Sequence, residues 1–156
     1  MRIKSFQHSK KSVKGVSLIE VLVSVLILAI GLMGIAAMQA TALSNSQSSL
    51  ERSQAVIHTY SIMEAMRANV TAARANAYSP ANDSGWICAA PAGGSLVADD
   101  INTWITDITT SNQTGCGRIE RVLPLANNEF RISVRWNDSR GLGGNAAQSL
   151  TTVSRL

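Results

Sequence analysis

The chain has 156 residues with a formal net charge of +4, and only 4% of its residues are aromatic. Eleven glycines and two cysteines exclude a collagen-like chain and a small disulfide-dense scaffold. The charge is uneven, because residues 1–15 carry five basic residues and no acid, while the remainder has a net charge of −1. The basic isoelectric point therefore describes a short N-terminal leader and does not mark the chain as a nucleic-acid-binding protein.

An apolar run follows the leader, over residues 16–38, and contains one charged residue, Glu20. As a helix this run spans about 35 Å, which is enough to cross the hydrocarbon core of a bilayer. The basic residues all precede it, so the N-terminus is expected in the cytoplasm. The alternative is a secretory signal cleaved after the small residues 40–42. The length of the run and the carboxylate within it count against that alternative.

Glu20 is the most informative residue of this run. An acid in a membrane helix costs about 3 kcal/mol unless it is paired, and it marks function by default. Its position near the start of the run also allows a simpler interpretation, in which the side chain only reaches the headgroup region.

A basic leader, a glycine and an apolar helix with glutamate at its fifth position together resemble the class III signal of type IV pilins and pseudopilins. The resemblance implies cleavage after Gly15 by a prepilin peptidase and methylation of the new Val16 amine. It also implies that the Glu20 carboxylate pairs with the N-terminal amine of an adjacent subunit. Val16 is a departure, since phenylalanine is most common at that position.

Further stretches resemble the type IV pilus modification (PilV-type) minor pilins. They are GLMGIAAMQ at 31–39, RSQA at 52–55, EAMRAN at 64–69, DDINTW at 99–104 and LP at 123–124. This resemblance implies an α+β, type IV pilin-like fold, in which a long N-terminal helix packs on a C-terminal antiparallel sheet. It implies a minor pilin that resides in the inner membrane and then in the pilus, with other minor pilins and the major pilin as partners and a link to twitching motility. Gly31, Gly34 and Ala37 fit close helix packing, or are ordinary membrane-helix residues.

The helical pattern is expected to continue over residues 39–77 as an amphipathic half. Leu43, Leu50 and Ile57 repeat at intervals of seven, and the apolar positions continue through Tyr60 and Met63. This stripe predicts the face that packs against a partner surface. Pro80 is expected to end the helix.

Residues 78–156 are predicted to form a globular head outside the membrane, in the periplasm. A loop over residues 78–98 precedes a short helix, which is expected to be capped by Asp99 or Asp100 and to bury Trp104. Strict alternation from Phe130 to Trp136 predicts a half-buried strand. Further strands are expected over residues 118–123 and 150–155, with a turn at residues 127–128.

Cys88 and Cys116 both fall outside the membrane on this topology. In an oxidising periplasm they are expected to pair and to close a loop of about 29 residues. Two free buried thiols are the alternative.

Catalytic or metal-binding chemistry is not indicated, and no cofactor is expected. The two histidines are His8, in the leader, and His58, which has no cysteine or aspartate at ligand spacing. Asp99 and Asp100 are adjacent, so their side chains should point apart and do not form an acid/base dyad. The chain is therefore not expected to be an enzyme.

Two other functions remain open. A type II secretion pseudopilin shares the leader and the glutamate. An adhesive or DNA-capturing head is suggested by charge, because residues 75–116 carry four acids and no base, while residues 117–156 carry six arginines and three acids. Such polarity equally suits docking between neighbouring subunits, which leaves nucleic acid as a disfavoured partner.

Overall fold

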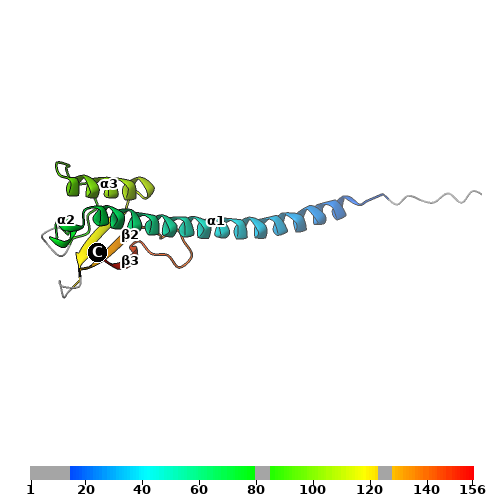
Figure 1. The fold of residues 1–156 in the computed structure, drawn as a ribbon. Helices are drawn as coiled ribbons and strands as arrows, with labels where there is room; N and C mark the ends of the chain where they lie inside the picture. The colour runs from blue at the N-terminus through cyan, green and yellow to red at the C-terminus, as the bar shows by residue number, and fades with distance from the viewer. Residues whose placement is uncertain (1–14, 80–84, 123–127) are drawn as a thin grey trace, which may run out of the picture. The chain divides into compact units, whose positions relative to one another are not determined.

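The computed structural model of the chain describes residues 15–79, 85–122 and 128–156 (Figure 1). Their elements, in chain order, are α1 (Leu18–Ala68), α2 (Val70–Arg74), α3 (Leu96–Ser111), β1 (Cys116–Arg121), β2 (Glu129–Trp136) and β3 (Gln148–Arg155). The chain forms two compact units, Met1–Ala40 and Thr41–Leu156, and α1 contributes residues to both. Several predictions fall on residues outside the described ranges. They are the leader before Gly15, the role of Pro80 in ending the helix, the LP stretch at 123–124 and the part of the predicted turn at Asn127.

The apolar run forms the first part of α1, which begins at Leu18, two residues after the predicted start. The carbonyl oxygen of Ser17 accepts hydrogen bonds from the backbone N–H groups of Glu20 and Val21 and so opens the first turn. The large hydrophobic residues of this segment are exposed. Within the described parts of the chain, α1 is the one helix long and apolar enough to cross a membrane.

The expectation of one helix reaching residue 77 is wrong. α1 ends at Ala68, and Asn69 leaves the helical region with φ −124° and ψ 53° before α2 begins. α2 then ends without proline. Asn76 adopts a left-handed φ of 65°, its N–H donates to Ala73 O, and the N–H of Ala77 donates to Ala72 O. This is a Schellman termination, with asparagine at the position that usually carries glycine.

The short helix of the head, α3, begins earlier than expected. Its N-cap is Ser95, whose side chain accepts a hydrogen bond from the N–H of Ala98, so the cap predicted at Asp99 or Asp100 is wrong. Asp99 instead lies in the first turn and accepts a hydrogen bond from the N–H of Gly94. The predicted apolar face is confirmed, since α3 buries Ile101, Trp104, Ile105 and Ile108.

The three strands form one antiparallel sheet in the order β1-β2-β3. The register pairs Ile119 of β1 with Ile132 of β2, and Ile132 with Thr152 of β3. The predicted apolar face is confirmed, because Phe130, Ile132, Val134 and Trp136 are all buried. The strict alternation is not, because Arg131 is exposed but Ser133 on the same face is buried. Strand alternation therefore identified the core face of the sheet correctly.

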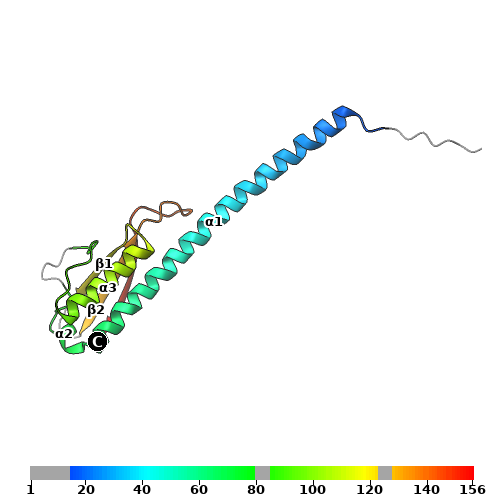
Figure 2. The same ribbon diagram turned by 90° about the horizontal axis from the view of Figure 1, so that it is seen from above.

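The core of the head joins this face of the sheet to α3 and to the second part of α1. Figure 2 shows α3 running alongside α1, and the indole N–H of Trp104 donates to the carbonyl oxygen of His58 at 2.9 Å. Gly117 is needed for this packing, since a Cβ there would lie 2.3 Å from the Trp104 ring. The α+β arrangement is that of a pilin-like fold, with a long N-terminal helix on a small antiparallel sheet.

The face of α1 that packs in this core agrees with the predicted stripe at Met63 but differs from it at the earlier positions. The buried residues of α1 are Ala55, Thr59, Ile62, Met63 and Met66. Leu43, Leu50, Ile57 and Tyr60 are instead exposed. Two of these buried positions, 55 and 59, carry small side chains. The large apolar residues that recur every seven positions, Leu43, Leu50 and Ile57, lie on a different, exposed face of α1.

Candidate functional site

The predicted processing residues lie at the beginning of the described chain. Gly15 has no atom within 4 Å of the position that a Cβ would occupy, and Val16 is exposed. Glu20 sits in the first turn of α1, where a negative charge interacts favourably with the helix dipole. Its carboxylate makes no hydrogen bond or ion pair within the described residues. The site therefore holds an acid whose partner is not supplied by these parts of the chain.

The rest of the apolar segment offers an open surface. A Cβ placed on Gly31 or Gly34 would meet no atom within 4 Å, and the large apolar side chains around these glycines are solvent-exposed. Small residues on an exposed helix permit another helix to approach closely. Lipid tails or other helices are the surroundings that such a surface fits.

Beyond this segment, the exposed residues Leu43, Leu50, Ile57 and Tyr60 define what we name the outer stripe of α1. The first three recur every seven residues and therefore share one side of the helix. Leu43 is 77% exposed and Ile57 is 63% exposed. A recurring seam of large apolar side chains in water is unfavourable and is typical of a contact surface.

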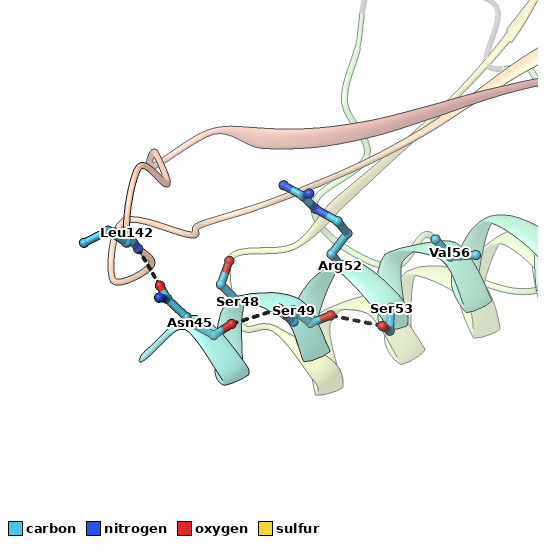
Figure 3. Close-up of a pocket in the computed structure, with 7 residues that line it drawn as sticks. All are labelled: Asn45, Ser48, Ser49, Arg52, Ser53, Val56 and Leu142. Carbon is cyan, nitrogen blue, oxygen red and sulfur yellow. Dashed lines mark hydrogen bonds between the residues drawn. The ribbon is translucent and has the colours of Figure 1, made fainter. Parts of the chain in front are cut away.

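A groove of about 580 Å³ lies between α1 and the loop that joins β2 to β3 (Figure 3). We name it the Arg52 groove. It is lined by Asn45, Ser48, Ser49, Arg52, Ser53, Val56 and Leu142. The loop is fixed on α1 by hydrogen bonds from Ser48 Oγ to Asp138 at 2.7 Å and from the Leu142 N–H to Asn45 Oδ1 at 3.3 Å. Both walls of the groove are therefore held in place.

Two acidic side chains, Glu51 and Asp138, lie near each other beside this loop. Asp138 is buried, and Glu51 of α1 is close enough for the two carboxylates to repel each other. Burial and this repulsion raise the pKa of Glu51, while the Arg140 guanidinium, 3.7 Å from the Glu51 carboxylate, acts in the opposite direction. A Cβ on Gly144 would lie 2.0 Å from the carbonyl oxygen of Asp138. Glycine at that position lets the loop fold over the acid.

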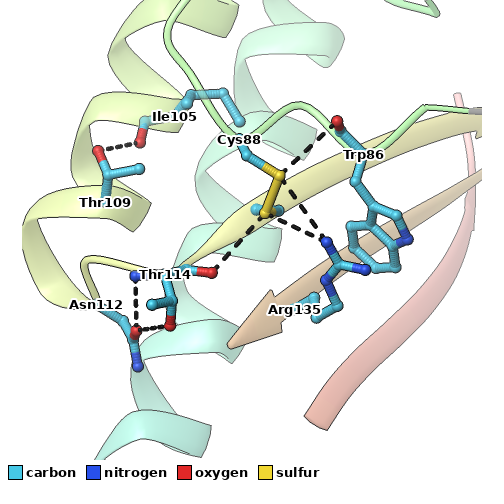
Figure 4. Close-up of a disulfide and its surroundings, with 8 residues drawn as sticks. Trp86, Cys88, Ile105, Thr109, Asn112, Thr114 and Arg135 are labelled. Carbon is cyan, nitrogen blue, oxygen red and sulfur yellow. Dashed lines mark hydrogen bonds between the residues drawn. A yellow bond between two sulfur atoms is a disulfide. The ribbon is translucent and has the colours of Figure 1, made fainter. Parts of the chain in front are cut away.

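Cys88 and Cys116 are joined by a disulfide, with their Cα atoms 4.3 Å apart (Figure 4). The bond ties the segment before α3 to the start of β1. The Ile87–Gly117 bridge reinforces the connection with backbone hydrogen bonds of 2.8 and 2.9 Å. On the same side, the Arg135 guanidinium lies 4.5 Å from the centroid of the Trp86 ring.

His58, Asp99 and Asp100 each have a hydrogen-bond partner within the head. His58 Nε2 lies 3.0 Å from Ser111 Oγ, and burial lowers the pKa of this histidine. Asp100 accepts a hydrogen bond from the Tyr78 hydroxyl, whereas Asp99 accepts one from Gly94, so the two acids point apart as expected. Among residues 15–79, 85–122 and 128–156, no three metal-binding side chains gather in one place.

Sequence reasoning missed the Arg52 groove and the buried acid Asp138. The glycine-rich composition of residues 137–145 is typical of a flexible connection, although the segment returns to α1 and is hydrogen-bonded there. Four small polar residues of α1 that contact or line the groove looked like a solvated helix face. Their clustering at residues 45–53 was the available signal.

Comparison with known families gives one result for this chain. The family model described as the prokaryotic N-terminal methylation motif matches residues 10–36, which include Gly15, Val16 and Glu20. No curated protein and no solved structure matches the chain. The motif implies processing by a prepilin peptidase and assembly with other pilins. Together with the long apolar helix and the small antiparallel sheet, it supports a membrane-anchored, type IV pilin-like subunit, a structural class of protein.

Proposed function

We propose that this chain is a minor pilin, a structural subunit of the type IV pilus that joins other minor pilins in the complex that primes or tips the filament. The observation that carries this proposal is the acid in the first turn of an exposed apolar helix, directly after the Gly15–Val16 step of the methylation motif. Glu20 finds no partner in the described residues, and a neighbouring subunit's N-terminal amine would neutralise it.

Membrane insertion precedes assembly in this proposal. The basic leader remains in the cytoplasm, residues 16–38 cross the inner membrane, and the head folds in the periplasm. The peptidase cleaves after Gly15, and the new Val16 amine is methylated. The disulfide agrees with this topology, because such bonds persist in oxidising compartments.

The PilV-type assignment rests on the sequence resemblances, which lie mainly along α1. The outer stripe of α1 supports an assembly role of this kind, because it leaves large apolar side chains available to other subunits. A type II secretion pseudopilin would share the methylation motif. Co-purification with pilus components, and not with secretion components, distinguishes the two.

The charges of the sheet favour a structural role over DNA capture. Glu120 lies against Arg118 and Arg131, and Glu129 forms an ion pair with Arg155 at 3.1 Å. These two acids offset part of the positive charge of the sheet, and an arginine held in an ion pair contributes less to binding a phosphate backbone, which releases counterions from many basic contacts. We therefore place nucleic acid second to other pilin subunits as a partner.

The test of the proposal replaces Glu20 with alanine and, separately, with glutamine. We expect both variants to be cleaved after Gly15 and methylated on Val16, as read by mass spectrometry of the mature N-terminus from membranes. We expect both to be depleted from sheared pili, since neither can pair with an adjacent amine. Normal entry of Glu20→Ala into pili would contradict the role of Glu20. A wild-type N-terminus at Leu43 would contradict the whole assignment.

A further inference from the structure

Arg52 differs from the other arginines of the described chain. Eight of them contact a carboxylate, a carbonyl or amide oxygen, or an aromatic ring, namely Arg67, Arg74, Arg118, Arg121, Arg131, Arg135, Arg140 and Arg155. Arg52 makes no such contact within residues 15–79, 85–122 and 128–156, although it lines a groove with fixed walls. Its guanidinium presents five N–H donors to whatever enters.

The neighbouring polar groups have already used most of their donors. Ser48 Oγ donates to Asp138, Ser49 Oγ donates to the Asn45 carbonyl at 2.9 Å, and Ser53 Oγ donates to the Ser49 carbonyl at 3.0 Å. Figure 3 shows the last two of these bonds along the helix. The hydroxyl groups therefore cannot donate to a ligand without breaking a bond. The donors left in the groove are the Arg52 guanidinium and the amide NH2 of Asn45, whose oxygen accepts from Leu142.

A set of donors around one positive charge selects a ligand that only accepts hydrogen bonds and is negatively charged. A carboxylate meets both conditions, because its two oxygens match the planar fork of arginine. One cation is too few for a nucleic-acid backbone, whose binding depends on several phosphate contacts. The chemistry of the groove therefore indicates a single carboxylate.

The rim of the groove indicates that this carboxylate belongs to a protein. Leu142 is 80% exposed at the tip of the loop, and Val56 is 38% exposed on α1. Apolar side chains beside a central charged anchor are the arrangement of a protein interface.

We propose that the Arg52 groove receives an aspartate or glutamate side chain from a neighbouring pilin-like subunit in the filament. This inference rests on the proposed function, because it assumes that the chain assembles with such subunits. The bound carboxylate would accept hydrogen bonds from Arg52 and Asn45, and Leu142 would pack beside the segment that carries it.

The test uses the full chain in cells that assemble pili. A photo-cross-linking phenylalanine derivative replaces Leu142 at the rim, and adducts from sheared pili are identified by peptide mass spectrometry. The same position is then combined with Arg52→Gln, with Arg52→Glu, or with Arg131→Gln as a control. The control also removes one positive charge, but on the outer face of the sheet, where Arg131 faces Glu120. Val16 methylation and entry into pili are measured for every variant.

We expect an adduct to a pilin-like subunit whose cross-linked peptide contains an acid. Its yield should fall about threefold in Arg52→Gln and at least about tenfold in Arg52→Glu, which places like charges together. Arg131→Gln should leave the yield unchanged. Replacing the partner's acid by arginine should restore the yield in Arg52→Glu.

Several outcomes would overturn the inference. They are an adduct that is insensitive to Arg52, an equal loss in Arg131→Gln, a cross-linked peptide without an acid, or a partner outside the pilin-like class. If the chain enters pili normally while the adduct ignores Arg52, the inference fails and the proposed function stands. If the methylated chain never enters pili and yields no adduct, both fail.

Discussion

At the scale of single residues, Tyr78 shows how one buried hydroxyl stabilises the head. The side chain is fully buried, and its hydroxyl donates a hydrogen bond to the Asp100 carboxylate of α3. Burial and this acid raise the pKa of Tyr78 to about 12, from an ordinary value near 10. The hydrogen bond connects the segment after α2 to α3 and contributes about 1–2 kcal/mol.

The raised pKa of Tyr78 predicts a loss of stability in alkali. Below about pH 10 the hydroxyl is protonated in both folded and unfolded chains, so its contribution is complete. As the pH rises from about 10 to 12, the unfolded chain ionises first, and the folded state is progressively destabilised. We expect denaturant unfolding of the detergent-solubilised chain to show this decline, and Tyr78→Phe to flatten it. Tyr60→Phe is the control, since Tyr60 is exposed, and it should leave the decline intact.

At the scale of elements, the end of α2 depends on the left-handed conformation of Asn76. The φ of 65° is accessible to asparagine at small cost and to glycine without cost. We expect Asn76→Ala to lower the free energy of unfolding by about 1 kcal/mol. We expect Asn76→Gly to leave it unchanged or slightly higher. Urea denaturation of the two variants provides the comparison, and equal destabilisation by both would contradict the conformational argument.

The two faces of α1 are expected to respond differently to substitution. Ile62 is 1% exposed in the core, so Ile62→Ala should cost about 2–4 kcal/mol of unfolding free energy. Leu50, in the outer stripe, is 57% exposed, and Leu50→Ser should change stability by less than about 0.5 kcal/mol. Leu50→Ser should instead reduce the amount of the chain in sheared pili. A core-like loss of stability in Leu50→Ser would show that the stripe is covered by the chain itself.

Helices and strands with a clear apolar periodicity were predictable from the sequence. The face of α1 that packs in the core was not. The alternation in β2 and the apolar spacing in α3 reflect burial against one neighbour, which the sequence pattern records directly. In α1, large apolar residues occur both in the core and on the outer stripe, and periodicity alone cannot tell which set packs within the chain. The buried face includes Ala55 and Thr59, which carry little hydrophobic signal.

The candidate site was predictable only in part, for a related reason. Gly15, Val16 and Glu20 lie close together in the chain, so the methylation motif can be identified in one segment. The Arg52 groove instead joins α1 to Leu142, 90 residues further along, through contacts that no local pattern encodes. The hydrogen bond from Ser48 to Asp138 is equally remote in sequence.

At the scale of the whole molecule, the disulfide is the main covalent constraint on the head. It closes a loop between residues separated by 28 positions, which restricts the unfolded chain by about 3.5 kcal/mol. We expect the double substitution of Cys88 and Cys116 by serine to lower the unfolding free energy by about this amount. The wild-type chain should migrate differently on gels with and without reductant. Two alkylatable thiols in the chain isolated without reductant would contradict the bond.

The same covalent loop has a mechanical consequence. Tension applied between the two ends of the head would pass from Cys88 to Cys116 through the sulfur atoms, and would bypass the intervening segment that contains α3. With 28 positions at about 3.4 Å each, less the 4.3 Å between the two Cα atoms, about 90 Å of contour length stays hidden while the bond is intact. A stretched head would therefore lengthen only outside residues 88–116, and the loop that contains α3 would carry no load.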